Sequence, residues 1–425
     1  SGKFKTTSVV VPNLLEGGAN KVILDVKGEI MKKYGLYLIE KGFTVRCLNL
    51  KYPQLSDRYN PCEYLETEED IIKLIANIHK SLDKPDAMKG DQFWDDGVDF
   101  YLQSIFYYEW YQSKKDNRKA LFNNVLSLVN DEAKIDETIP VEKGQKPITE
   151  LQKKMDALAK EDSPDNPAVR DYRKLKNGAT ETVRSILIIT NAKLKLCQTK
   201  ALKRIFEEDD MNIKEFATGV GGTLEKPTKN KLIIFLCVDD SDQSYNFVCS
   251  MLYSQASTIL MRMADNDFDG KLPIPLEMWL DEFYAGARPA DCAQLMGVIR
   301  SRNISMIPIL QSVSQLKDLY QGDKAEIIHD NVPIFWFGGC GQGAIETQKA
   351  ISELLGKSTV DISSDGYNGN NRSNNYQKTG RELMTPAEVK NMDKHNCVVF
   401  LEDERPVFDR KSLPWENNPL YDHAM

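Results

Sequence analysis

Short apolar segments that alternate with segments of helical spacing constrain the fold of this chain more than any other feature. Several of the apolar segments are rich in β-branched residues and end in a polar residue, which is typical of buried strands. Consecutive parallel strands need a crossover connection, usually a helix, so the alternation predicts an α/β fold with a parallel sheet flanked by helices. The predicted strands lie at 21–26, 44–50, 231–240, 276–282, 305–311 and 333–339.

One long segment that interrupts this alternation is predicted to be helical throughout. Thr67 followed by Asp70 gives it a capped helix start. An apolar and aromatic stripe at helical spacing follows, and it is more typical of a packed core than of a surface that stacks on nucleic-acid bases. The stripe consists of Trp94, Val98, Tyr101, Leu102, Ile105 and Tyr108. We therefore predict an inserted all-α domain at 64–185, between two parts of the α/β domain at 1–63 and 186–425.

The charge balance argues against one class of nucleic-acid-binding protein. The 425 residues include 55 Lys and Arg and 63 Asp and Glu, which gives a net charge of −8. Proteins that wrap duplex DNA over a broad surface are basic instead. A local basic channel remains compatible with the total, because the field depends on how charges are distributed.

The cysteines and histidines predict no metal site. The eight cysteines include no pair with CxxC spacing, and several lie inside apolar segments. Reduced and mostly buried thiols are therefore expected. The four histidines lie far apart, and we interpret them as incidental.

Neither a signal peptide nor an apolar run long enough to cross a bilayer is visible in the sequence. The sequence starts at Ser1 without a methionine. We therefore expect a processed or partial chain, and a membrane anchor before Ser1 stays an open possibility.

Two segments near the C-terminus carry local signals. Residues 363–380 are rich in Ser, Asn and Gly, which predicts a surface loop. Thr385, Pro386 and Glu388 then have the spacing of a capping box with proline in the first turn. This pattern predicts a helix that begins after Thr385.

Polar residues follow several of the predicted strands, at the edge where open parallel sheets bind ligands. Asp281 and Glu282 end one strand, Gln311 ends the next, and Asp25 lies near the end of the first. Hydrolysis of a nucleoside triphosphate needs an acid for Mg²⁺, a group that orients water and a polar group that senses the terminal phosphate. An Asp-Glu pair can equally form a simple polar turn, so the pair alone does not decide the function.

The partner of such a cluster is a phosphate-binding loop with the pattern G-x-x-x-x-G-K-[ST]. Lys5 and Thr6 fit its last two positions, although Phe4 stands where the last glycine is expected and the first glycine would precede Ser1. Without such a loop, a Lys-Thr pair near a terminus is typical of a solvated chain end. Arg300 and Arg302 close a predicted helix and could be dipole partners or an arginine finger for a neighbouring subunit.

Taken together, these motifs resemble the TraG-like type IV coupling proteins, the ATPases of conjugative type IV secretion, and look most like the versions from Gram-positive bacteria. The resemblance covers nearly the whole chain. Its most specific part is the block that runs from "LDEF" at 280 through "IRSRNIS" to "ILQSVSQL" at 316. The other matching segments are 5–15, 25–29, 59–61, 247–255, 351–361 and 375–389.

The resemblance implies an RecA-like P-loop NTPase fold with an inserted all-α domain, and it implies ATP and Mg²⁺ as cofactors. Thr6 and Asp281 would hold Mg²⁺, Glu282 would polarise the attacking water, Gln311 would sense the terminal phosphate, and Arg300, with Arg302 second, would act on a neighbour's nucleotide. The implied nucleotide-binding residues are Gly2, Lys5, Thr6, Asp25 and Lys27. Three positions depart from the family pattern: Phe4, Val26 and Pro308, of which Pro308 suggests an edge strand or a bulge.

The function that the resemblance implies is an ATPase that recruits relaxase-bound single-stranded DNA and drives it into a type IV secretion channel. It would act as a homo-hexamer at the cytoplasmic face of the plasma membrane, through an anchor absent from this chain. Three alternatives stay open: a docking receptor without ATPase activity, a duplex-DNA translocase, and a coupling protein whose cargo is mainly protein.

Overall fold

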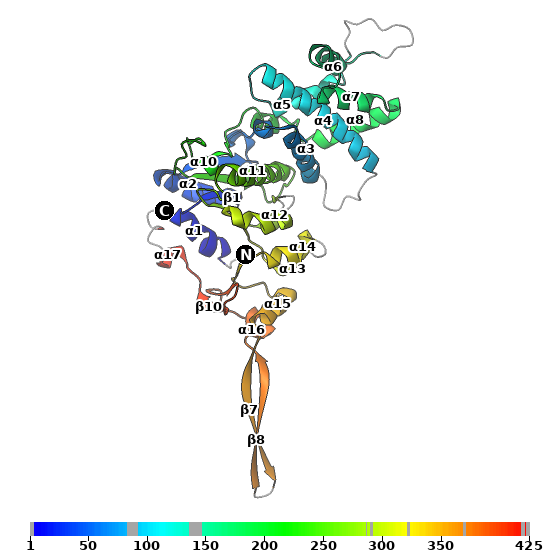
Figure 1. Ribbon diagram of the computed structural model, residues 1–425. Helices are drawn as coiled ribbons and strands as arrows, with labels where there is room; N and C mark the ends of the chain where they lie inside the picture. The colour runs from blue at the N-terminus through cyan, green and yellow to red at the C-terminus, as the bar shows by residue number, and fades with distance from the viewer. Residues whose placement is uncertain are drawn as a thin grey trace. The chain divides into compact units, whose positions relative to one another are not determined.

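The computed structural model describes residues 4–82, 92–135, 147–285, 287–289, 292–320, 324–368, 371–417 and 421 (Figure 1). The chain divides into two compact units. The sheet unit comprises Ala19–Leu280 and Ala285–Met306, and the terminal unit comprises Ser1–Gly18, Asp281–Tyr284 and Ile307–Met425.

A five-stranded sheet of order β2-β3-β1-β4-β5 forms the centre of the α/β fold. β1 pairs in parallel with both β3 and β4, and β2 pairs in parallel with β3, which confirms the predicted parallel sheet. Every residue of β3 is buried, as expected for a strand covered on both faces. The strands of this sheet are β1 (Asn20–Val26), β2 (Thr44–Asn49), β3 (Leu232–Val238), β4 (Leu276–Leu280) and β5 (Ile304–Pro308).

Proline ends the edge strand of this sheet. β5 lies at one end of the strand order and finishes at Pro308. Since proline cannot donate to a β ladder, it is tolerated at such an edge. The edge position suggested by Pro308 is therefore confirmed.

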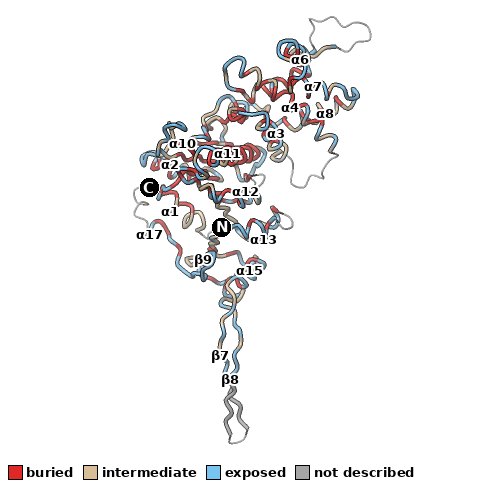
Figure 2. The backbone as a smooth tube through the Cα atoms, viewed as in Figure 1, coloured by how far each residue is buried: buried red, intermediate tan, exposed pale blue. Residues whose placement is uncertain are grey.

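Helices connect the parallel strands. α2 (Glu29–Glu40) links β1 to β2, α11 (Asn246–Asp267) follows β3, and α12 (Cys292–Ile299) lies between β4 and β5. Most of α11 is buried, and its backbone is red over most of its length in Figure 2. A helix that is apolar on most sides is typical of a protein interior.

In the described residues between β2 and β3, the named elements are helices and short 3₁₀ turns, and one isolated β-bridge joins Ile135 to Thr149. Thr67 and Asp70 exchange the hydrogen bonds of a helix cap, Thr67 Oγ1 accepting from the Asp70 amide at 3.3 Å and Asp70 Oδ2 accepting from the Thr67 amide at 3.1 Å. The helices are α3 (Glu68–Leu82), α4 (Gln92–Lys115), α5 (Phe122–Asp131), α6 (Glu150–Glu161), α7 (Pro167–Lys176), α8 (Thr180–Leu194), α9 (Lys200–Ile205) and α10 (Glu215–Thr218).

The aromatic stripe of α4 is core, as predicted. Val98, Tyr101, Leu102 and Ile105 are all at most 2% exposed, while Trp94 and Tyr108 at the flanks of the stripe are half-buried. An amphipathic helix is stabilised mainly by burying such a face.

The terminal unit starts with a helix and contains a second, antiparallel sheet of order β10-β9-β6. A π-helical turn, η1 (Thr6–Val10), runs into α1 (Val11–Glu16), which ends at Gly17 with a left-handed φ of 66°. The other elements are α13 (Val313–Leu319), α14 (Lys324–Asp330), β6 (Ile334–Phe337), α15 (Ile345–Leu355), β7 (Lys357–Asn368), β8 (Asn371–Glu382), α16 (Pro386–Lys390), β9 (Asn396–Leu401), β10 (Val407–Arg410) and α17 (Pro414–Asn417).

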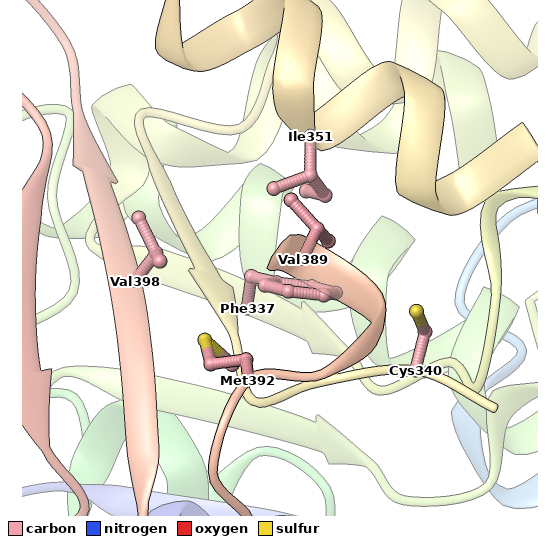
Figure 3. Packing of buried hydrophobic residues seen from close by; sticks show 6 residues of the cluster. All are labelled: Phe337, Cys340, Ile351, Val389, Met392 and Val398. Carbon is pink, nitrogen blue, oxygen red and sulfur yellow. The ribbon is translucent and has the colours of Figure 1, made fainter. Parts of the chain in front are cut away.

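A small apolar core holds the antiparallel sheet to α15 and α16. Figure 3 shows its side chains gathered around Phe337. The cluster consists of Phe337, Cys340, Ile351, Val389, Met392 and Val398. The predicted capping box at the start of α16 is present, with Thr385 and Glu388 bonded in both directions.

Two predictions for this unit were wrong. The apolar run at 333–339 does form a strand, but β6 pairs antiparallel with β9 and does not extend the parallel sheet. The segment 363–380 was predicted as a loop, but its described residues, 363–368 and 371–380, belong to a long hairpin in which β7 and β8 pair from Lys357 and Glu382 to Asn368 and Asn371. In both cases the pairing partner decides the outcome, and local composition does not encode it.

All eight cysteines are buried and unbridged, so the predicted buried thiols are confirmed. Among the described helices, none combines the length and the apolar character needed to cross a membrane.

Candidate functional site

Asp281 and Glu282 leave the end of β4 with different environments. Asp281 is only 8% exposed, whereas Glu282 is exposed. The Glu282 amide donates to Asp281 Oδ1 at 3.1 Å, and Glu282 itself has a left-handed φ of 50°. This backbone region costs a non-glycine residue on the order of 1 kcal/mol, and such residues cluster at functional sites.

Thr6 lies against the buried carboxylate. Its Oγ1 donates to Asp281 Oδ2 at 2.6 Å. Burial raises the pKa of Asp281 above its ordinary value, the Thr6 hydrogen bond opposes this, and the nearby charge of Glu282 adds to it. A carboxylate that is desolvated in this way gains from a cation placed beside it.

Lys5 reaches into the same region from the start of the first helix. Its Nζ donates to the backbone carbonyl of Leu310 at 2.8 Å. Burial lowers the pKa of Lys5, while the charges of Asp281 and Glu282 act in the opposite direction. Within the terminal unit, an ammonium group, a hydroxyl group and two carboxylates therefore meet.

Gln311 follows Leu310, the residue that holds Lys5. The Gln311 side chain is exposed, and its backbone amide donates to Gln315 Oε1 at 2.7 Å. Ser312 then caps α13 by accepting from the Gln315 amide. The predicted phosphate sensor thus lies one residue from the contact of Lys5, on a turn held by the start of α13.

Asp25 and Lys27 belong to the sheet unit, where they have other contacts. Asp25 is buried, and its two oxygens accept from the amides of Ile30 and Met31 at 3.2 and 2.8 Å. Asp25 therefore caps the start of α2, which is a structural role. Lys27 has a φ of 80° and pairs with Asp240 at 3.2 Å.

The two arginines near the end of α12 differ in their contacts. Arg302 donates to both oxygens of Asp265 at 2.8 Å and to the Val298 carbonyl at 2.8 Å. Arg300 is exposed at the start of the short turn η5 (Arg300–Arg302). A bidentate ion pair therefore holds Arg302, and the arginine-finger role of Arg300 stays a prediction.

Gly2 lies outside the described residues. The sequence also offered no signal for the Leu310 contact, because any residue supplies a carbonyl. It gave no reason to single out His395 or Trp415, although both contact the ring of Phe4, and His395 was interpreted as incidental.

The five-stranded parallel sheet with its connecting helices is that of a RecA-like P-loop NTPase fold. The chain resembles the solved bacterial conjugative coupling protein TrwBdeltaN70 in its unbound monoclinic form, with a TM-score of 0.64 and 15% identity over 97% of this chain and 83% of that one. It also resembles the plasmid coupling protein TrwB in complex with ADP and Mg²⁺, with a TM-score of 0.60 and 15% identity over 95% and 80% of the two chains. At such identities these likenesses establish the fold.

Residues 1–424 match the family model described as "Type IV secretory system Conjugative DNA transfer", so the chain belongs to this family. Two curated relatives, both named "Conjugal transfer protein TraG" and both from Escherichia coli, are 23% and 22% identical over 94% and 91% of this chain. The chain spans 62% and 60% of their lengths. The predicted membership among TraG-like coupling proteins is therefore confirmed.

Proposed function

We propose that this chain is the nucleotide-hydrolysing part of a conjugative coupling protein. The observation that carries the proposal is the hydrogen bond from Thr6 to the buried Asp281, with Lys5 close to the same carboxylates. A hydroxyl and an acid that share Mg²⁺, next to a lysine for the phosphates, are the recurring parts of P-loop NTPases.

The residues present fit ATP and Mg²⁺. Thr6 and Asp281 would hold the metal ion, and the desolvation that raises the pKa of Asp281 would be relieved by its charge. Lys5, with Gly2 before it, would bind the phosphates by exchanging the Leu310 carbonyl for a phosphate oxygen. Bound Mg²⁺ would neutralise the charge that develops on the phosphate oxygens.

Two further side chains complete the proposed chemistry. Glu282 is exposed beside Asp281, where its carboxylate would orient and polarise the attacking water. Gln311 would sense the terminal phosphate, and its position next to Leu310, whose carbonyl accepts from Lys5, supports this role. Asp25 and Lys27 remain proposed neighbours of the nucleotide, although the capping role of Asp25 weighs against direct contact.

The solved relatives support nucleotide binding. TrwB is described in complex with a non-hydrolysable ATP analogue and, separately, with ADP and Mg²⁺. We transfer this chemistry to the present chain because its own Thr6 donates to Asp281 and its Lys5 feels the charge of the same carboxylate.

The assembly and cargo are further parts of the proposal. The protein would form a homo-hexamer in which Arg300 completes the site of a neighbouring subunit. It would recruit relaxase-bound single-stranded DNA and pass it to the channel components of the secretion system, and the helical domain at 64–185 would meet the cargo. An anchor outside this chain would hold it at the cytoplasmic face of the plasma membrane.

We favour nucleotide hydrolysis over the docking-receptor alternative. It rested on the idea that the Phe4 ring crowds the phosphate loop. Phe4 instead has a φ of 57°, the left-handed conformation that a glycine would adopt, and its ring contacts His395 and Trp415.

ATP hydrolysis by the full-length protein, with single-stranded or duplex DNA, tests the proposal. We expect hydrolysis that single-stranded DNA stimulates and that Glu282→Gln lowers by at least a hundredfold. Glu225→Gln, at an exposed glutamate of the sheet unit, is the matched control and should leave the rate unchanged. Absence of nucleotide binding in the wild type would refute the proposal, and a strict preference for duplex DNA would favour a duplex translocase.

A further inference from the structure

The ring of Phe4 is held by the C-terminal part of the terminal unit. It stacks on His395, with ring centroids 6.0 Å apart and planes at 26°, and it meets Trp415 edge-on at 6.0 Å and 73°. The Nζ of Lys394 lies 5.9 Å from the centre of the same ring. Offset-stacked and edge-to-face geometries are those in which aromatic pairs attract beyond their buried area.

The segment that receives the ring is itself fastened to the antiparallel sheet. The backbone amide of Lys411 donates to the His395 carbonyl at 2.6 Å. The side chain of Lys411 is 1% exposed, and its Nζ donates to the carbonyls of Gly338 and Lys394 at 2.7 Å each. Lys394 and His395 therefore form a supported surface for Phe4.

Phe4 pays a conformational cost that glycine would avoid. Its φ of 57° is unfavourable for a residue with a Cβ atom, by about 1–2 kcal/mol. A ring contact worth about 0.5–1.5 kcal/mol offsets much of that cost. Phe4 thus adopts a backbone conformation that favours glycine, and a segment distant in the sequence holds its side chain.

The backbone of Phe4 is hydrogen-bonded to the first turn of the helix that follows it, and it leads directly into two residues of the proposed nucleotide site. Its carbonyl accepts from the Ser8 amide at 2.8 Å and from Ser8 Oγ at 2.5 Å, which sets the first turn of the helix. Lys5 follows directly and reaches the Leu310 carbonyl, and Thr6 follows with its bond to Asp281. A shift of Phe4 would therefore change the direction in which both side chains leave the loop.

We propose that Phe4 is a positioning residue for the nucleotide site: its ring, held by His395 and Trp415, orients Lys5 and Thr6 toward phosphate and metal. The inference rests on the proposed function, because it concerns how that site is set. It assigns to the segment 394–415 an influence on nucleotide affinity.

The test is the affinity of the full-length protein for ADP with Mg²⁺, measured by calorimetry for variants of the ring and its receiver. We expect Phe4→Gly and Trp415→Ala each to weaken binding about two- to tenfold, the range that corresponds to one aromatic pair. The double variant should bind no more weakly than the worse single variant, since Phe4→Gly already removes the contact that Trp415→Ala breaks. Phe4→Tyr, which keeps the ring, should restore the affinity of the wild type.

Control measurements separate positioning from general destabilisation. Tyr376→Ala removes an aromatic side chain that is 73% exposed on β8 and should leave affinity unchanged. Thermal unfolding of every variant shows which of them are folded at the temperature of the binding assay. Phe4→Gly that binds as tightly as the wild type, or losses that multiply in the double variant, would overturn the inference. A wild type that binds no nucleotide would instead refute the proposed function.

Discussion

Replacing Thr6 with valine would delete one hydroxyl group while keeping the β-branched shape of the side chain. That hydroxyl donates to Asp281 Oδ2 at 2.6 Å. Asp281 is 8% exposed and would keep the Glu282 amide, at 3.1 Å, as a donor. Because water reaches so little of the carboxylate, solvent cannot readily replace the lost partner.

A hydrogen bond to a charged group contributes about 1.5–3 kcal/mol. We expect Thr6→Val to lower the free energy of unfolding of the unliganded protein by this amount at pH 7. Burial raises the pKa of Asp281, and the Thr6 bond is the strongest influence that lowers it, so the variant raises that pKa further. A raised carboxyl pKa gives stability that is present at low pH and lost as pH rises through the folded-state pKa. The defect of Thr6→Val should therefore shrink in acid.

Urea-induced unfolding at several pH values measures this effect. Thr6→Ser retains the hydroxyl group and should stay within about 1 kcal/mol of the wild type. Thr359→Val makes the same chemical change at an exposed position of β7 and controls for the loss of a hydroxyl as such. A loss below about 0.5 kcal/mol, or an equal loss when Asp281 is already alanine, would show that the bond does not form in solution.

Three other predictions follow from the same structure. Glu282→Gly should relieve the strain of the left-handed φ of 50° and raise the free energy of unfolding by about 0.5–1 kcal/mol, while abolishing hydrolysis. Urea unfolding and a turnover assay on the same preparation would measure both effects. A destabilised variant would contradict the left-handed conformation of Glu282. Arg300→Ala should slow hydrolysis only under conditions of assembly, measured against protein concentration, and an equal effect of Arg302→Ala would argue against the arginine finger. Burial raises the pKa of Asp209 to about 6, so the stability that Asp209 contributes is present below pH 4 and lost as pH rises through 6. The advantage of the wild type over Asp209→Asn should therefore fall by about 2 kcal/mol between pH 4 and pH 7, and a difference that does not vary with pH would contradict the raised pKa.

Local signals in the sequence were sufficient to predict features that depend on residues close together in the chain. A capping box depends on residues three apart, so Thr67 and Thr385 could be identified directly. The helical stripe of α4 was correctly predicted to be core, because residues at this spacing share one face. The alternation of strands and helices likewise predicted the parallel sheet and its edge at Pro308.

Predictions that depend on a distant partner were less secure. The composition of 363–380 is that of a loop, yet the backbone at 363–368 and 371–380 is paired in a hairpin. The run at 333–339 is apolar enough for a parallel strand, yet β9, more than fifty residues later, is its neighbour. Strand propensity describes a half-buried pleated surface and carries no information about which strand lies alongside.

The sequence by itself determined the fold class, the family and the list of polar residues at the strand ends, because these follow from short-range periodicity and motif order. Only the tertiary structure decided how that list is used. It brings Thr6 to Asp281 across 275 positions and Lys5 to Leu310 across 305, it engages Arg302 and Asp25 in structural contacts, and it stacks the ring of Phe4 on His395. The reason is that directed contacts such as a hydrogen bond at 2.6 Å depend on where folding places each backbone segment, and residue type alone does not specify that position.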